Sequence, residues 1–151
     1  MNTIETLKAV QEKLGLNQRE LGVYAGVSTR TMNAWCTGYR ECPEHVAELI
    51  ARLAYMDAKA LEDGQPTSTM RRWCIRSSYG IDEFLTPAGS KADALRLAKM
   101  EWEHMTEKEK ANAETFEVCL VDIRLTDRTI DGCFGWADSG EVYDIAKDYL
   151  K

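Results

Sequence analysis

The first third of the chain carries apolar residues at the three- and four-residue spacing of amphipathic helices. Leu21 and Ala25 lie four positions apart and share the inward face of a helix that begins at Gln18. The same spacing recurs before this helix, directly after it, and again beyond Pro43. The expected core positions of those segments are Ile4, Leu7, Val10, Leu14, Met32, Trp35, Val46, Leu49, Ile50 and Leu53. The pattern predicts a helical N-terminal region.

Glycine and serine residues divide this region at regular points. Gly22 lacks a side chain and so allows another helix to cross closely, and Gly26 lies where the helix must end, at a position that favours positive φ. Ser28 is a good N-cap for a helix over residues 29–37, which a glycine ends. Residues 16–43 therefore predict two short helices joined by a tight turn, an arrangement that can place one helix in a DNA major groove.

The C-terminal half begins with the two-residue alternation of a strand. Trp73 and Ile75 fall on one face of this strand. The other face carries Arg72, Cys74 and Arg76. Such alternation is typical of a half-buried strand, with its apolar face on a core and its polar face in water.

Further strands and helices are expected beyond it. Strands are predicted over residues 70–77, 81–85, 116–125 and 132–136, and helices over 90–105, from 106 onward and over 141–150. The expected buried positions of the longer helices are Ala92, Leu95, Ala98, Trp102 and Met105, and then Val142, Ile145, Ala146 and Tyr149. These elements predict a small α+β domain with a three- or four-stranded sheet and helices on one face.

A polar stretch separates the two regions. Residues 63–69 contain Gly64 and Pro66 among polar side chains, which is typical of a linker. A chain of 151 residues can bury two small cores. We therefore expect a helical domain over residues 1–62, a linker over 63–69 and an α+β domain over 70–151.

The spacing within residues 16–43 resembles a known family. Leu21 is followed by the small Gly22, then by the turn Gly26, a Val-Ser pair and a Trp35-x-x-Gly38 run. This resembles the Cro/repressor (XRE-type) helix-turn-helix family, over about residues 3–53. The resemblance implies an all-α domain of five helices that binds a double-stranded DNA operator. Since one such domain covers a half-site, it also implies a homodimer.

The resemblance also implies which residues meet DNA. Gln18, at the start of the second helix, would bind a phosphate, and Thr29 and Arg30 would reach base edges. The full implied set is Gln18, Arg19, Ser28, Thr29, Arg30, Asn33, Ala34, Thr37, Tyr39 and Arg40. The chain departs from the family where Glu-Asn is common between the tryptophan and the glycine, because Cys36 and Thr37 stand there.

Charge complicates this interpretation. Residues 1–56 hold six basic residues and six glutamates, and residues 63–151 hold 12 basic and 17 acidic residues, a net charge of −5. An acidic domain repels a phosphate backbone. The exception is the cluster of Arg71, Arg72 and Arg76, which is a candidate surface for an acidic partner or for DNA. The alternative is a solvated strand face whose arginines pair with nearby carboxylates.

Composition excludes several functional classes. Five cysteines, an odd number without a Cys-x-x-Cys pair, are typical of reduced thiols rather than of a disulfide framework or a zinc site. Glu101 and His104 form only half of a carboxylate-bridged metal site. No apolar run is long enough to span a membrane, and the N-terminus lacks a signal-peptide layout. We expect a cytoplasmic protein that is not an enzyme and uses no metal or cofactor.

Two functional hypotheses of different class follow. The first is a transcriptional regulator, a repressor of phage or mobile-element type, whose C-terminal domain dimerises or senses a ligand or partner. The runs TSTM…WCIRS and DALRLAKMEWEHMTEKEK resemble parts of small domains of phage and mobile-element proteins. The second is a protein inhibitor like the anti-CRISPR proteins, whose acidic C-terminal domain would occupy a nucleic-acid groove of an effector. An antitoxin that docks a toxin through this domain is a further alternative.

Overall fold

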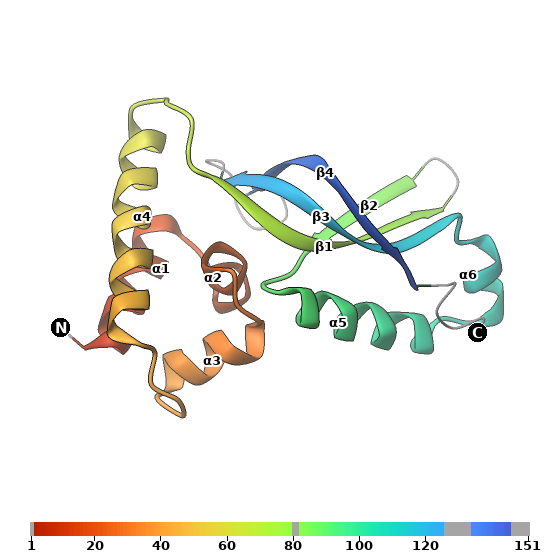
Figure 1. The fold of residues 1–151 in the computed structure, drawn as a ribbon, viewed down its shortest axis with the longest axis horizontal. Coiled ribbons are helices and arrows are strands. Elements are labelled where there is room, and N and C mark those ends of the chain that lie inside the picture. Colours follow the sequence, from red (N-terminus) through yellow and green to blue (C-terminus); the bar gives the residue numbers. More distant parts are fainter. Residues whose placement is uncertain (1, 80–81, 126–133, 146–151) are drawn as a thin grey trace.

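The computed structural model describes residues 2–79, 82–125 and 134–145 of the chain (Figure 1). Helices come first, and a four-stranded sheet with two more helices follows. The helices of the N-terminal region are α1 (Thr3–Leu14), α2 (Gln18–Ala25), α3 (Thr29–Thr37) and α4 (Glu44–Glu62). The expected helical N-terminus is confirmed, and none of the described helices is long and apolar enough to cross a membrane.

Side-chain caps and left-handed glycines fix the ends of these helices. The Asn17 side chain accepts a hydrogen bond from the Glu20 backbone N–H at 2.8 Å, and the Glu20 carboxylate accepts one from the Asn17 N–H at 2.8 Å. Gly26 then ends α2 at a φ of 79° and Gly38 ends α3 at a φ of 81°. Only glycine adopts this conformation without steric cost, so the expected turn positions are confirmed.

The N-terminal region has four helices among its described residues, where the resemblance implies five. α4 continues for 19 residues, since no glycine or proline interrupts it. Its inward stripe consists of Ala47, Ile50 and Ala54. Leu49, which was expected inside, is 61% exposed because it lies one residue, and so 100° around the helix, from Ile50. That expectation was wrong.

An antiparallel sheet forms the second region. Its strands are β1 (Thr69–Tyr79), β2 (Asp82–Pro87), β3 (Thr115–Leu125) and β4 (Phe134–Asp144), in the spatial order β2-β1-β3-β4. All three neighbouring pairs are antiparallel. The strands predicted over residues 81–85 and 116–125 are confirmed as β2 and β3, and β3 lies inside the sheet between β1 and β4. The α+β class of the C-terminal region is also confirmed.

One helix covers a face of this sheet, and a shorter helix follows it. α5 (Lys91–His104) begins at the Ser90 cap, and α6 (Glu107–Asn112) begins at a capping box on Thr106. Figure 1 shows α5 running along the sheet face. Ala94 and Ala98 of α5 are fully buried, whereas Ala92, expected inside, is exposed.

The end of the chain differs from the prediction. β4 runs through Asp144, so the helix expected over residues 141–150 does not begin where the pattern placed it. Val142 and Tyr143 instead pair with Cys119 and Val118 of β3, and Val142 is 47% exposed. Valine and tyrosine fit a half-exposed strand well, and the sheet pairing outweighs their helical spacing. Ile145 is buried as expected. Residues 146–150, and 132–133 of the expected last strand, lie outside the described residues.

Apolar clusters pack on both faces of the sheet. Ile75 and Val118 face α5, whereas Cys74, Cys119 and Ile123 face the N-terminal helices. Burying a valine or isoleucine side chain contributes roughly 1.5–3 kcal/mol to stability. The expectation that the second face of the β1 strand would lie in water was wrong, because Cys74 is completely buried against the helical region.

The segment between helix and sheet contacts both regions. Thr67 is buried and donates a hydrogen bond from Oγ1 to the Leu125 carbonyl at 2.8 Å, and the Ser68 backbone N–H donates to Asp57 Oδ1 at 2.8 Å. The boundaries at residues 62 and 70 follow the change from helix to sheet, but one apolar cluster crosses them. The division into separate domains remains a prediction.

Candidate nucleic-acid interface

α3 presents one polar face away from the core. Met32 and Cys36 point into the core, and their side chains are buried. Ser28 starts the helix, because its Oγ accepts a hydrogen bond from the Thr31 backbone N–H at 3.0 Å. On the opposite side, Arg30 and Asn33 are exposed. The helical period thus separates an anchoring face from an outward polar face.

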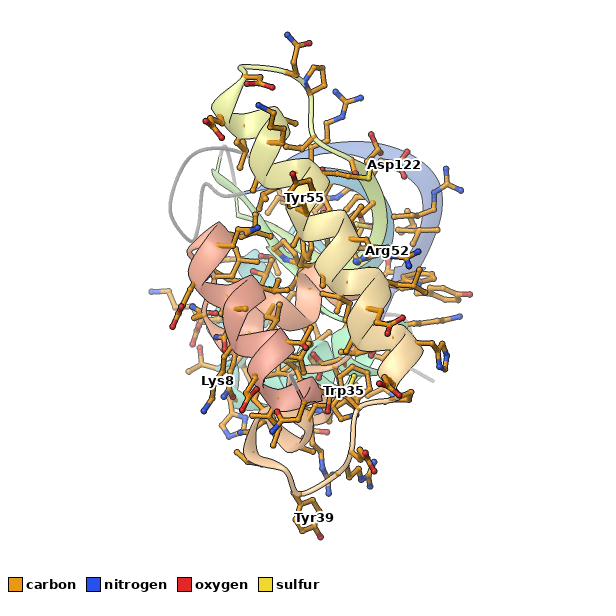
Figure 2. All side chains as sticks on the ribbon, turned by 90° about the vertical axis from the view of Figure 1, so that its left-hand side faces the viewer. Lys8, Trp35, Tyr39, Arg52, Tyr55 and Asp122 are labelled. Carbon is orange, nitrogen blue, oxygen red and sulfur yellow. The ribbon has the colours of Figure 1, made fainter. Side chains whose placement is uncertain are left out.

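Six of the ten expected DNA-contacting residues gather around one hollow. It has a volume of about 410 Å³ and is lined by Arg30, Thr31, Asn33, Ala34, Thr37, Tyr39 and Arg40. Tyr39 is 85% exposed and lies in the loop after α3. Figure 2 shows it at one tip of the molecule, far from Tyr55 on α4. The hollow therefore lies along α3 and its following loop, and it combines two guanidinium groups with amide, hydroxyl and phenol groups.

Several of the expected residues lie partly inside the protein or use their side chains in bonds within it. Gln18 and Thr29 are half-buried in the first turns of α2 and α3. The Ser28 oxygen accepts the N-cap hydrogen bond, and the Ser28 O–H donates to Thr31 Oγ1 at 3.0 Å. Thr37 Oγ1 donates back to the Asn33 carbonyl at 2.9 Å. These bonds hold the ends of α3 in place.

Arg19 turns toward the sheet region rather than toward the hollow on α3. Its Nη2 donates to the Pro87 carbonyl at 3.4 Å. It also lines a second, mainly apolar hollow of about 490 Å³ together with Ile75, Leu97 and Met100, near Glu101 and His104. Arg19 thus connects the first turn of α2 to the end of β2.

The three arginines of β1 do not form a common outward surface. Arg71 is exposed and pairs with Asp122, with Nε 3.0 Å from Oδ1. Arg76 is half-buried, with Nε 3.6 Å from Glu117 Oε1. Arg72 points to the helical region, where burial lowers the pKa of its guanidinium. Arg71 and Arg76 therefore pair with carboxylates of the neighbouring strand, whereas Arg72 binds backbone carbonyls of the helical region.

A buried polar network joins the two regions, and sequence reasoning missed it. The Tyr24 hydroxyl donates to Asp57 Oδ2 at 2.5 Å, and Asp57 is 2% exposed. Burial and this hydrogen bond raise the pKa of Tyr24. A signal was present in the sequence, because Asp57 follows Ile50 and Ala54 on the inward stripe of α4. An acidic residue at such a position needs a buried partner.

Chemistry at cysteine and histidine finds little support among the described residues. Burial raises the pKa of the Cys74 thiol to about 12, and burial also raises the pKa of Cys36 and Cys42. His45 and His104 are exposed. Within the described part of the chain, no three His, Cys, Asp or Glu side chains gather where they could hold a metal ion.

Comparison of the chain with protein-family models, curated proteins and solved structures finds no match.

Proposed function

We propose that the protein is a sequence-specific DNA-binding transcriptional regulator, a repressor of phage or mobile-element type that acts as a homodimer on a double-stranded operator. One observation carries the proposal. The outward face of α3, held by a cap at each end, presents Arg30 and Asn33 beside the exposed Tyr39 and Arg40. We call α3 the recognition helix in this sense.

The chemistry of these side chains fits duplex recognition. Arg30 carries two parallel donors that match O6 and N7 of guanine in the major groove. Asn33, almost one turn further along, has the donor and acceptor that match adenine. Tyr39 and Arg40 follow the helix, where phosphate contacts would fix its register on the duplex.

Charge explains why the proposal includes a dimer. Glu41 and Glu44 lie directly after Arg40 in the chain, so one copy offers a small positive surface. Non-specific affinity depends on the number of phosphates that are neutralised. A single copy should therefore bind weakly, and two copies on adjacent half-sites would combine their affinities.

Selection of bound duplexes from a random pool would test the proposal. Selection should return a short sequence repeated with two-fold symmetry, and the repeat spacing would report the geometry of the dimer. Arg30→Ala should then weaken binding to the selected duplex by about 1–3 kcal/mol and relax specificity at one position.

Arg52→Ala is the matched control, because Arg52 is exposed on α4 and the substitution removes the same charge. Figure 2 shows Arg52 on the outer side of α4, away from Tyr39. It should leave affinity unchanged. Absence of salt-dependent duplex binding by the unmodified protein, even at low ionic strength, would refute the proposed function.

A further inference from the structure

The sheet region touches the helix-turn-helix at the residues that determine where α3 begins. Figure 1 places α2 between α4 and the sheet, with the α2–α3 turn beside the start of α5. We define this turn as residues 26–28. Three residues of the sheet region contact this turn or α2: Arg72 of β1, Pro87 at the end of β2 and Gly89 in the loop after β2.

Arg72 of β1 binds the C-terminal end of α2. Its guanidinium donates from Nε to the Val23 carbonyl and from Nη2 to the Tyr24 carbonyl, the latter at 2.6 Å. The last carbonyls of a helix lack partners within the helix, and a cation is favoured there. The same guanidinium covers Gly26, where a Cβ atom would lie 3.3 Å from Arg72 Cζ.

Gly89 contacts the turn itself. A Cβ atom on Gly89 would lie 1.4 Å from the Val27 carbonyl oxygen and 3.0 Å from the Ser28 backbone nitrogen. Because both positions belong to backbone, any side chain at residue 89 would have to push the two segments apart. Ser28 is the N-cap of α3, so the displaced atoms would be those that start the recognition helix.

From these contacts we infer that the sheet region positions the recognition helix, with Arg72 and Gly89 as its positioning residues. The inference rests on the proposed function for its effect on DNA binding, but the contacts exist without DNA. Arg72 fixes the end of α2, Gly89 fixes the turn, and Arg19 bonds to Pro87 at the other end of α2. A shift of the sheet region would therefore displace the end of α2 and the turn before α3 through these contacts, without a rearrangement of the apolar core.

Hydrogen exchange in the full-length protein tests the inference without DNA. Arg72→Gln should raise amide exchange of residues 22–32 by about tenfold, since loss of a charged hydrogen bond weakens local protection. Arg71→Gln is the matched control, because it removes the same charge from the adjacent position, whose side chain is exposed. Unchanged exchange of residues 22–32 in Arg72→Gln would overturn the inference.

Arg72→Lys keeps the charge but lacks the planar pair of donors, and it supplies a second variant if Arg72→Gln folds poorly. It should also raise exchange in residues 22–32, because an ammonium group cannot match two carbonyls in the same geometry. Full protection in Arg72→Lys would mean that charge alone is needed, which would overturn the positioning role of the guanidinium.

Binding to the selected duplex separates positioning from charge. Arg72→Gln and Gly89→Ala should each weaken specific binding by about tenfold, while weak binding to unrelated duplexes stays the same, because a displaced α3 loses base contacts first. Arg71→Gln should bind like the unmodified protein. An equal loss in Arg71→Gln and Arg72→Gln would show an electrostatic effect and overturn the inference. If the unmodified protein binds no duplex, the proposed function fails, and the exchange experiment still decides the inference.

Discussion

The outward face of α3 and the contacts behind the α2–α3 turn differ in how the chain encodes them. The outward face is local, since Ser28, Gly38 and the inward Met32 lie within or next to the helix that they define. The contacts behind the turn join Arg72 to Tyr24, 48 positions away, and Asp57 to Tyr24, 33 positions away. Residues close in sequence thus determine where the helix begins and ends, whereas contacts between residues distant in sequence determine how the helix is positioned.

This difference bears on the independence of the two regions. If the helix-turn-helix were a complete unit tethered to a second domain, changes at the sheet would leave it unaffected. One apolar cluster instead contains Leu21 and Met32 together with Cys74 and Val121. A polar network crosses the same boundary. We therefore expect a substitution at this boundary to affect both regions together.

Asp57→Ala should give the largest effect. The substitution leaves the Tyr24 hydroxyl and the Ser68 backbone N–H without their buried acceptor, and the expected loss in the free energy of unfolding is about 3 kcal/mol. Urea denaturation would measure it. Asp57→Asn retains one acceptor oxygen and should lose about half as much. Equal stability of Asp57→Ala and the unmodified protein would show that the network contributes nothing.

Arg72→Gln should lower the free energy of unfolding by about 2 kcal/mol, because two α2 carbonyls lose a charged donor. Arg71→Gln should leave the urea midpoint unchanged, since Arg71 is exposed.

During unfolding, far-UV circular dichroism and tryptophan fluorescence should change together in both variants, because the helices and the sheet share a core. Two separate transitions would instead indicate two independent domains.

Alkaline pH should lower the free energy of unfolding, because Tyr24 and Cys74 are buried where the helical region meets the sheet. The folded pKa of Tyr24 is raised above its ordinary value of 10.0, so the stabilisation is complete below pH 10 and is lost as the pH rises further. Cys74 adds to this loss, because its folded pKa of about 12 also lies above its ordinary value of 9.0. Tyr24→Phe should show a shallower fall in stability above pH 10. An identical fall in both proteins would exclude Tyr24 as a source.

Much of the helical region could be predicted from the sequence because its signals are local. The left-handed glycines and the Ser28 cap predict α3 to the residue, whereas Leu49 was misplaced because an apolar stripe does not state which helices will cover it. The strand through Val142 was mistaken for a helix since its pairing with Cys119 is long-range. Arg72 seemed a surface residue because nothing adjacent in sequence reveals the α2 carbonyls that it binds.

Loss of a single helix cap should give the smallest effect. Ser28→Ala removes the acceptor for the Thr31 N–H and should cost about 1 kcal/mol of stability. Asn17→Ala removes the corresponding acceptor at α2 and should cost a similar amount. Only the Ser28 variant should also weaken binding to the selected duplex, because its cap precedes the recognition helix. If Asn17→Ala weakens binding equally, α2 contributes to DNA recognition as much as α3, and the assignment of α3 as the recognition helix is wrong.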